Sequence, residues 1–196
     1  KQMRLTYEDG ISDKEPKVLK PKQVMFENPT TITFDYDMKE KQYYVYGYGK
    51  LQGSYEIAGD AIQKADSYGG VVVDQSQSYI WERGNRDLNY TIDHSDEVMA
   101  QLKAKLNEGV SPIEVMKELG SGTTLDLTGC TSEQLAYIIN QGKPVIGIQK
   151  DGKAIILVGY TDTDIIYVDA ASGERKTSTF EEMDALTAGT GHTYIG

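Results

Sequence analysis

The segment Gly142–Gly173 reads GKPVIGIQKDGKAIILVGYTDTDIIYVDAASG, and it decides which fold this chain adopts. Its three apolar runs, at 145–148, 154–160 and 164–169, have the length of strands that are buried in a sheet. Asp151 and Gly152 separate the first two runs, and Asp-Gly between apolar runs is a strong hairpin signal. The segment therefore predicts an antiparallel sheet in the C-terminal part of the chain.

Helices are predicted before this sheet. The first begins at Asp93 or Ser95, either of which could cap it, and it continues to about Leu106. Ser111 and Glu114 flank a proline at the first helical position, which predicts a second helix that ends near Gly120. The remaining expected elements are a helix over 132–141 started by Thr131 and Gln134, a short helix started by Ser178 and Glu181, and a last strand over 192–195.

The first half of the chain has a different pattern. Residues 1–22 mix lysines, acidic residues and prolines without periodicity, and they indicate a tail or linker. Strands are expected at 31–36, 42–48, 71–74 and 78–82, and a helix at 54–66 with Ser54 as its cap and Gly69-Gly70 after its end. We therefore expect an α+β protein with a tail (1–22), a tyrosine-rich α+β unit (23–92) and a helical region with an antiparallel sheet (93–196).

Composition excludes several classes of function. The chain has 196 residues, 39% hydrophobic and 26% charged, which describes a soluble globular protein. Its formal net charge of −10 makes nucleic acid an unfavourable partner, because phosphates repel an acidic surface. No apolar run approaches the roughly 18–20 residues of a membrane span. The chain begins at Lys1, so we expect a trimmed or mature form.

Cysteine and histidine are scarce. One cysteine excludes an internal disulfide and a zinc site built from several cysteines. His94 and His192 are not spaced as a ligand pair, so neither a metal nor another cofactor is expected. Few cysteines together with many Tyr, Thr and Gly residues favour a bacterial protein outside the cytoplasm, secreted or at the cell surface. The sequence does not fix an oligomeric state.

The Gly-Lys-Pro-Val strand, the strand ending in Val-Gly-Tyr and the strand ending in Asp169 together resemble papain-like cysteine peptidases of the C39, bacteriocin-processing class. In that class a helix leads to a Gly-x-Pro-Val strand, a histidine-bearing strand follows, and a third strand ends in aspartate. The resemblance covers Leu125–Ile195. It implies a papain-like fold in the C-terminal region, with Asp169 in the place of the carboxylate that orients the histidine.

The same resemblance shows which catalytic parts are missing. Lys153 and Ala154 stand where the family has its histidine. The family's nucleophile lies on an early helix, whereas Cys130 precedes the helix that leads directly into the sheet. The helix expected at 54–66, which would match the catalytic helix, contains no cysteine. The resemblance therefore implies a catalytically degenerate relative.

An enzyme remains an alternative. Cys130 is at the start of a predicted helix, where the helix dipole and free backbone N–H groups lower a thiol pKa and favour the thiolate nucleophile. His192 could supply the imidazole and Asp169 the orienting carboxylate. The other interpretations are a buried, inert cysteine, a histidine at the end of a strand and an aspartate that forms a turn. His94, among acidic residues, is expected at the surface.

Aromatic residues crowd the first half, and the whole chain has 14 tyrosines against 3 phenylalanines. On a strand Tyr44, Tyr46 and Tyr48 would share one face. With Trp81, and with Lys153 at the degenerate cleft, they are candidate binding residues, because exposed rings stack on sugars and grip extended peptides. Alternatively the rings cover a thin core. The strand–helix–strand run also faintly resembles half of a sporulation-related peptidoglycan-binding repeat.

Three functions are consistent with these patterns. The first is a non-catalytic module that binds peptide or cell-wall material through the cleft that a peptidase would use. The second is a cysteine peptidase or acyl transferase that uses Cys130, His192 and Asp169. The third is a structural segment of a larger surface protein.

Overall fold

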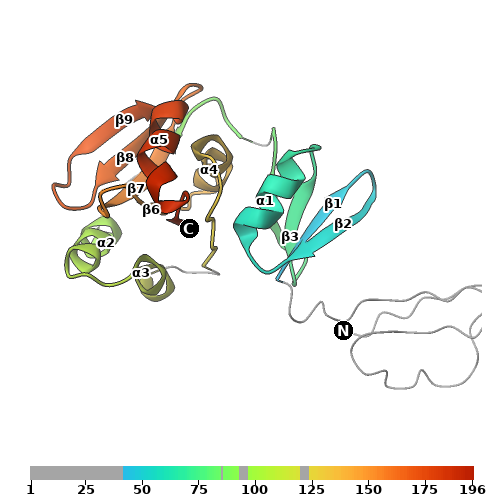
Figure 1. The fold of residues 1–196 in the computed structure, drawn as a ribbon, viewed down its shortest axis with the longest axis horizontal. Helices are drawn as coiled ribbons and strands as arrows, with labels where there is room; N and C mark the ends of the chain where they lie inside the picture. The colour runs from blue at the N-terminus through green and yellow to red at the C-terminus, as the bar shows by residue number, and fades with distance from the viewer. Residues whose placement is uncertain (1–41, 85, 93–96, 120–123) are drawn as a thin grey trace, which may run out of the picture. The chain divides into compact units, whose positions relative to one another are not determined.

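The computed structural model describes residues 42–84, 86–92, 97–119 and 124–196 (Figure 1). Residues 42–196 form one compact unit, and it is described by itself. The predicted tail at 1–22, the strand at 31–36, the cap candidates Asp93 and Ser95, and His94 lie outside the described residues. The described fold is mixed, with α-helices and antiparallel sheets, which confirms the α+β class.

The first sheet, called sheet A, contains β1 (Tyr43–Gly47), β2 (Lys50–Tyr55), β3 (Val71–Asp74) and β4 (Tyr79–Glu82) in the order β2-β1-β3-β4. Helix α1 (Ala58–Asp66) connects β2 to β3 and packs against the sheet. Tyr43 and Val45 share a buried cluster with the apolar face of α1, namely Ala58, Ala61, Ile62 and Ala65. Alternate residues of β1 therefore face the helix.

The start of α1 differs from the prediction. Ser54 lies inside β2, and the helix begins after Ile57, whose side chain makes no cap hydrogen bond. Sequence reasoning missed β2 because its Lys, Gln, Gly and Ser residues do not alternate with apolar ones. The end of the helix agrees with the prediction, since Gly69 has a φ of 72° and the Gly70 N–H donates to the Ala65 carbonyl at 2.7 Å.

The second sheet, sheet B, contains β6 (Val145–Ile148), β7 (Ala154–Tyr160), β8 (Asp164–Asp169), β9 (Arg175–Thr179) and β10 (Tyr194–Ile195) in the order β10-β6-β7-β8-β9. The short β5 (Tyr90–Thr91) pairs with the end of β7. The three predicted strands and the turn at Gly152, with a φ of 83°, are confirmed. β9 was not predicted, because its alternating charged and hydroxyl side chains have no apolar pattern.

Helices cover both faces of sheet B. Ile155 and Leu157 of β7 belong to the cluster that includes α4 (Ser132–Ile139) and α5 (Phe180–Thr187). Ile156 and Val158 belong to a second cluster, with α2 (Glu97–Asn107) and α3 (Pro112–Leu119). The continuous apolar sequence of β7 thus reflects burial on both faces. No helix in the described part of the chain is long and apolar enough to cross a membrane.

The structure confirms the predicted start of one helix and corrects the predicted start of another. Thr131 and Gln134 form a reciprocal capping box at α4, as predicted. At α5 the cap is Thr179, whose partner is Glu182, so the prediction of Ser178 and Glu181 is one residue early. The turn Ala188–Thr190, a 3-10 helix, then leads to β10.

The two sheets are joined by a shared core and by directional contacts. The buried cluster that contains Tyr43 and Trp81 also contains Leu135 and Tyr137 of α4. The Trp81 indole N–H donates to the Gln134 carbonyl at 3.0 Å, and its ring lies 5.3 Å from the Tyr137 ring. Residues of the expected α+β unit (23–92) therefore pack against residues of the expected C-terminal region (93–196).

Candidate functional site

Cys130 is enclosed in the core. It has no exposed surface, and its Sγ lies 4.0 Å from the carbonyl oxygen of Gly59 in α1. Burial, and then the nearby carboxylates Asp126 and Asp60, raise the pKa of the thiol. This direction is opposite to the one expected for a nucleophile at a helix start. Burial outweighs the helix dipole here, because no solvent reaches the sulfur to stabilise a thiolate.

His192 belongs to a different set of contacts. Its Nδ1 is 3.1 Å from the Thr187 hydroxyl, which in turn lies 2.8 Å from the Tyr194 hydroxyl. The His192 carbonyl accepts from the Gly129 N–H at 3.0 Å, so the backbones of 129 and 192 are neighbours. The interactions of the two side chains nevertheless do not link the imidazole to the thiol of Cys130. His192 has a φ of 56°, in the turn before β10.

Asp169 acts as a turn former. Its carboxylate accepts from the backbone N–H groups of Ala171 at 3.0 Å and Ser172 at 2.8 Å. These hydrogen bonds, first of all the one from Ser172, lower the pKa of Asp169. The geometry therefore matches the turn interpretation of this residue.

The strand register brings the matched positions of the resemblance together. Ile155 of β7 pairs with Asp169 of β8, and the Ala170 N–H donates to the Ala154 carbonyl at 3.1 Å. Lys153 and Ala154 thus stand beside the end of β8. The positions that match the family's histidine and aspartate are neighbours, but lysine and alanine occupy the first of them.

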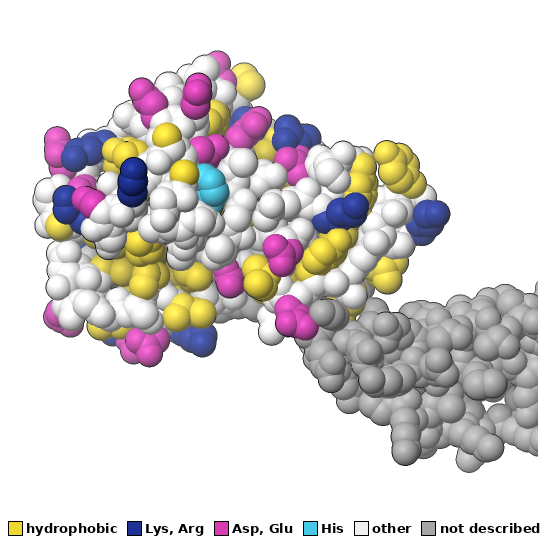
Figure 2. Space-filling view, viewed as in Figure 1, with side chains coloured by type: hydrophobic (Ala, Val, Ile, Leu, Met, Phe, Trp, Pro, Cys, Tyr) yellow, Lys and Arg dark blue, Asp and Glu magenta, His cyan; other side chains and the backbone are white. Residues whose placement is uncertain are grey.

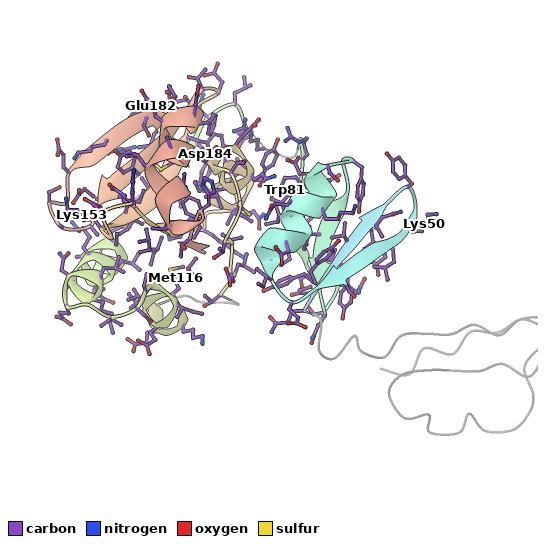
Figure 3. The ribbon with its side chains drawn as sticks, viewed as in Figure 1. Lys50, Trp81, Met116, Lys153, Glu182 and Asp184 are labelled. Atoms are coloured by element: carbon purple, nitrogen blue, oxygen red, sulfur yellow. The ribbon has the colours of Figure 1, made fainter. Side chains whose placement is uncertain are left out.

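Lys153, labelled in Figure 3, and Ala154 also line a hollow of about 370 Å³, which we call the β7 hollow. Its walls come from the end of α2, the start of α3, the β6–β7 hairpin and the turn after β8, and they include Leu106, Val110, Pro112, Ile148 and Ala170. Asn107 braces the hollow by donating to the Ala170 carbonyl at 3.1 Å.

Lys153 is the only charged side chain among the described residues that line the β7 hollow. Its Nζ lies 2.8 Å from the Asp151 carboxylate, and this hydrogen bond raises the pKa of Lys153. The pair is exposed and has little effect on stability. The hollow therefore offers a mixed lining of apolar and polar groups, with the Lys153–Asp151 ion pair at its rim, which suits a ligand with both apolar and polar groups.

A larger, shallow and mostly apolar hollow of about 870 Å³ lies between α5 and the β6–β7 turn. Lys150, Ser178, Glu182 and Leu186 are among its lining residues. The Ser178 hydroxyl is enclosed and has no hydrogen-bond partner in the described structure. Sequence reasoning missed this hollow, because its residues come from segments without a common motif.

The candidate aromatic residues separate into two groups. Tyr44 is 1% exposed and Trp81 is 0% exposed, so neither ring offers a face to a ligand. Tyr46 is half-buried on β1. Tyr48 is 82% exposed and lies in the β1–β2 turn rather than in the strand, so it does not share a strand face with Tyr44 and Tyr46.

Two arginines follow β4, and they make different contacts. Arg83 forms a two-pronged ion pair with Asp66 and approaches Glu133. The guanidinium of Arg86 lies 5.2, 5.0 and 5.6 Å from the ring centres of Tyr137, Tyr160 and Phe180. No sequence signal marks this aromatic cage, since its rings come from α4, β7 and α5.

Comparisons of this chain with models of protein families, with curated proteins and with solved structures find no match. In the part of the chain that the structure describes, no group of three or more His, Cys, Asp or Glu side chains is placed to hold a metal ion.

Proposed function

We propose that this chain is a non-catalytic, papain-like module, related to the C39 peptidases, that binds peptide in the β7 hollow. The observation that carries the proposal is the position of Lys153 and Ala154. They line a hollow beside the end of β8, at the place where the resemblance calls for a catalytic histidine. A ligand-sized hollow thus coincides with the degenerate catalytic position.

The burial of Cys130 and the raised pKa of its thiol support a binding role over a catalytic one. A peptidase nucleophile must ionise and must reach a substrate carbonyl. Cys130 has no exposed surface, and its raised pKa keeps the thiol protonated at neutral pH. The hydrogen bond of the His192 ring is with Thr187.

The lining of the β7 hollow supports a peptide as the ligand. Val110, Pro112 and Ala170 offer apolar contacts, and Lys153 offers an ammonium group at the rim, which a ligand carboxylate would share with Asp151. A short peptide fits these groups when apolar side chains fill the hollow and a carboxylate pairs with Lys153. We place the module outside the cytoplasm as part of this proposal, so that peptides of the bacterial cell wall are the first class of ligand to test.

The binding experiment is an NMR titration of the ¹⁵N-labelled full chain with two probes. These are the cell-wall stem pentapeptide L-Ala-γ-D-Glu-L-Lys-D-Ala-D-Ala and a tryptic digest of casein. We expect shift changes at Val110, Lys153 and Ala170, and affinity at least fivefold weaker in Lys153→Gln. Lys150→Gln is the matched control, because Lys150 is an exposed lysine of the same hairpin outside the β7 hollow.

Two results would contradict peptide binding in the β7 hollow. One is the absence of shift changes with both probes. The other is equal weakening by Lys150→Gln and Lys153→Gln, since the hollow then plays no part.

A labelling experiment tests the non-catalytic part separately. We expect iodoacetamide to leave Cys130 of the native chain unmodified at pH 7 and to label it fully in urea, as read by intact mass. The raised thiol pKa and full burial are the reasons. Rapid native labelling, together with casein hydrolysis that disappears in Cys130→Ala, would establish the enzyme instead.

A further inference from the structure

The turn between β1 and β2 presents an aromatic ring to solvent. Tyr48 and Gly49 connect the strands, and the Tyr48 side chain is 82% exposed. Their φ angles are 51° and 73°. Positive φ at both central residues is typical of the type I′ turn, which favours Asn-Gly.

A tyrosine is a costly choice at this position. A bulky side chain at positive φ is strained, whereas asparagine tolerates the same backbone. The exposed ring also gains little from burial. Such strain clusters at functional sites, which makes this turn a candidate for ligand contact.

A second tyrosine supports the first. The ring of Tyr68 lies 5.9 Å from that of Tyr48, at an interplanar angle of 27°. Gly47 makes room for it, since a Cβ there would lie 2.5 Å from a carbon of the Tyr68 ring. The Tyr68 hydroxyl is enclosed and has no hydrogen-bond partner in the described part of the chain. Ring stacking and the space left by Gly47, rather than a hydrogen bond from the hydroxyl, therefore position this pair.

Two lysines lie on the Tyr68 side of the pair, although the whole chain has a formal net charge of −10. The Lys64 Nζ is 5.6 Å from the centre of the Tyr68 ring. Lys50 pairs with Gly47 across the hairpin, and directly opposed residues share a sheet face, so Lys50 is on the Tyr68 side. Figure 3 shows Lys50 pointing away from the hairpin, and Figure 2 shows basic and hydrophobic side chains together at this end.

An extended peptide is disfavoured at this end of sheet A. A peptide strand would have to pair with the edge strand β2, but the register shifts there, with Val45 opposite Gly53 and Tyr46 opposite Leu51. The bulged Gln52 donates its side-chain amide to the Gly47 carbonyl at 2.7 Å. Bulges and edge lysines block strand addition. A sugar ring needs only a flat aromatic face and a few donors.

We propose that Tyr48, Tyr68, Lys50 and Lys64 form a site for an acidic polysaccharide. The apolar face of a pyranose stacks on the Tyr48 ring, and the sugar carboxylate pairs with the lysines. The site is separate from the β7 hollow. A result for or against peptide binding in that hollow therefore does not decide whether this site exists.

The test is a pull-down and titration of the full chain with three polymers. Polygalacturonate is the acidic glycan, dextran the neutral glycan, and poly-L-glutamate the acidic chain without sugar rings. We expect binding to polygalacturonate alone, weakening as salt rises from 50 to about 500 mM because the ion pairs are exposed. Tyr48→Asn should lower the affinity at least tenfold while the Tm stays equal or rises.

Variants of the chain distinguish the possible results of the binding test. Leu88→Asn is the matched control, because Leu88 is 80% exposed in another loop, and it should bind as the wild type does. Lys50→Gln with Lys64→Gln should remove the salt dependence. Absence of polygalacturonate binding, or full binding by Tyr48→Asn, overturns the proposal. Equal binding of poly-L-glutamate identifies an acidic-peptide site instead, and equal binding of dextran excludes a role for the lysines.

Discussion

Strands β7 and β2 lie in opposite environments within one compact unit. The side chains of β7 are buried from Ile155 to Tyr160, with helices on both faces of the strand. β2 is an edge strand, and each of its residues is exposed or half-exposed. The comparison teaches where stability and function can be separated. Side chains around β7 determine whether the chain folds, whereas β2 and the β1–β2 turn are free to carry residues that the fold does not need.

The contacts between sheet A and α4, which we call the joint, determine how far stability and function can be separated. Gln134 of α4 makes both connections to the sheet A side: its carbonyl accepts from the Trp81 indole, and its side-chain amide donates to Asp66, which also pairs with Arg83. If the joint is strong, the β1–β2 hairpin is rigidly attached to a stable body. The three substitutions that follow should destabilise the joint by decreasing amounts.

Trp81→Ala should have the largest effect. The ring is 0% exposed and its N–H is hydrogen-bonded, so we expect a loss of about 3–5 kcal/mol in the free energy of unfolding. Urea unfolding followed by circular dichroism measures it, and hydrogen exchange of the β7 amides shows whether sheet B is affected. Tyr79→Ala, at a partly exposed ring of the same strand, is the control and should lose much less. Equal losses would mean that burial at the joint is unimportant.

Gly59→Ala should come next. Gly59 lies at the start of α1, and its N–H donates to the Asp126 carbonyl at 2.9 Å. A methyl group there would overlap the Thr128 carbonyl oxygen, so we expect a loss of about 1–3 kcal/mol from overpacking. Thermal melts of Gly59→Ala and of Asp60→Ala, an exposed neighbour, provide the comparison. A Tm increase in Gly59→Ala, as helix propensity alone would give, would contradict a close approach of α1 to this segment.

Asp66→Asn should have the smallest effect of the three, about 1–2 kcal/mol at pH 7. The hydrogen bond from Arg83, with help from Gln134, lowers the pKa of Asp66. A carboxylate with a lowered folded-state pKa stabilises fully above its unfolded value of about 3.9 and loses this contribution as pH falls through the folded pKa. Arg83 is 44% exposed, which keeps the effect modest.

Urea unfolding between pH 7 and pH 2.5 measures this contribution. The wild type should lose more stability on acidification than Asp66→Asn, while Asp162→Asn, at an exposed turn, should follow the wild type. Parallel acid curves for wild type and Asp66→Asn would show that the ion pair does not support the joint.

The sequence was most informative where burial was complete. β6, β7 and β8 were predictable because strands buried on both sides require long apolar runs, and the Thr131 cap of α4 because capping is a local interaction. β2 and β9 were missed, since edge strands pack little and tolerate Lys, Gln and Thr. Ser54 was misassigned as a cap because a serine in a strand and a serine before a helix look alike without their neighbours.

The candidate site was less predictable than the fold. The resemblance pointed to Lys153, Ala154 and Asp169, and the strand register does bring these positions together. The burial of Cys130 depends on α1, 71 residues earlier in the chain, and no local pattern reveals it. The Arg86 cage and the Tyr48–Tyr68 pair also arise from long-range packing. Tyr48 was expected in a strand, because Tyr-Gly occurs twice in residues 46–49 and does not by itself mark a turn.

The pairing of β10 also has a consequence for synthesis on the ribosome. β6 to β9 follow one another through short connections and can pair as they emerge, whereas β10 arrives only after α5. The segment around Asp126 pairs with Ile195, and the Leu127 N–H donates to the Tyr194 carbonyl at 2.9 Å. That same segment receives the Gly59 N–H of α1.

The nascent chain can therefore form the β6–β9 hairpins early, whereas the pairing of β10 with β6 and with the segment around Asp126 is non-local and forms later. Until Tyr194 and Ile195 have left the exit tunnel, β6 and the segment around Asp126 and Leu127 lack their strand partner.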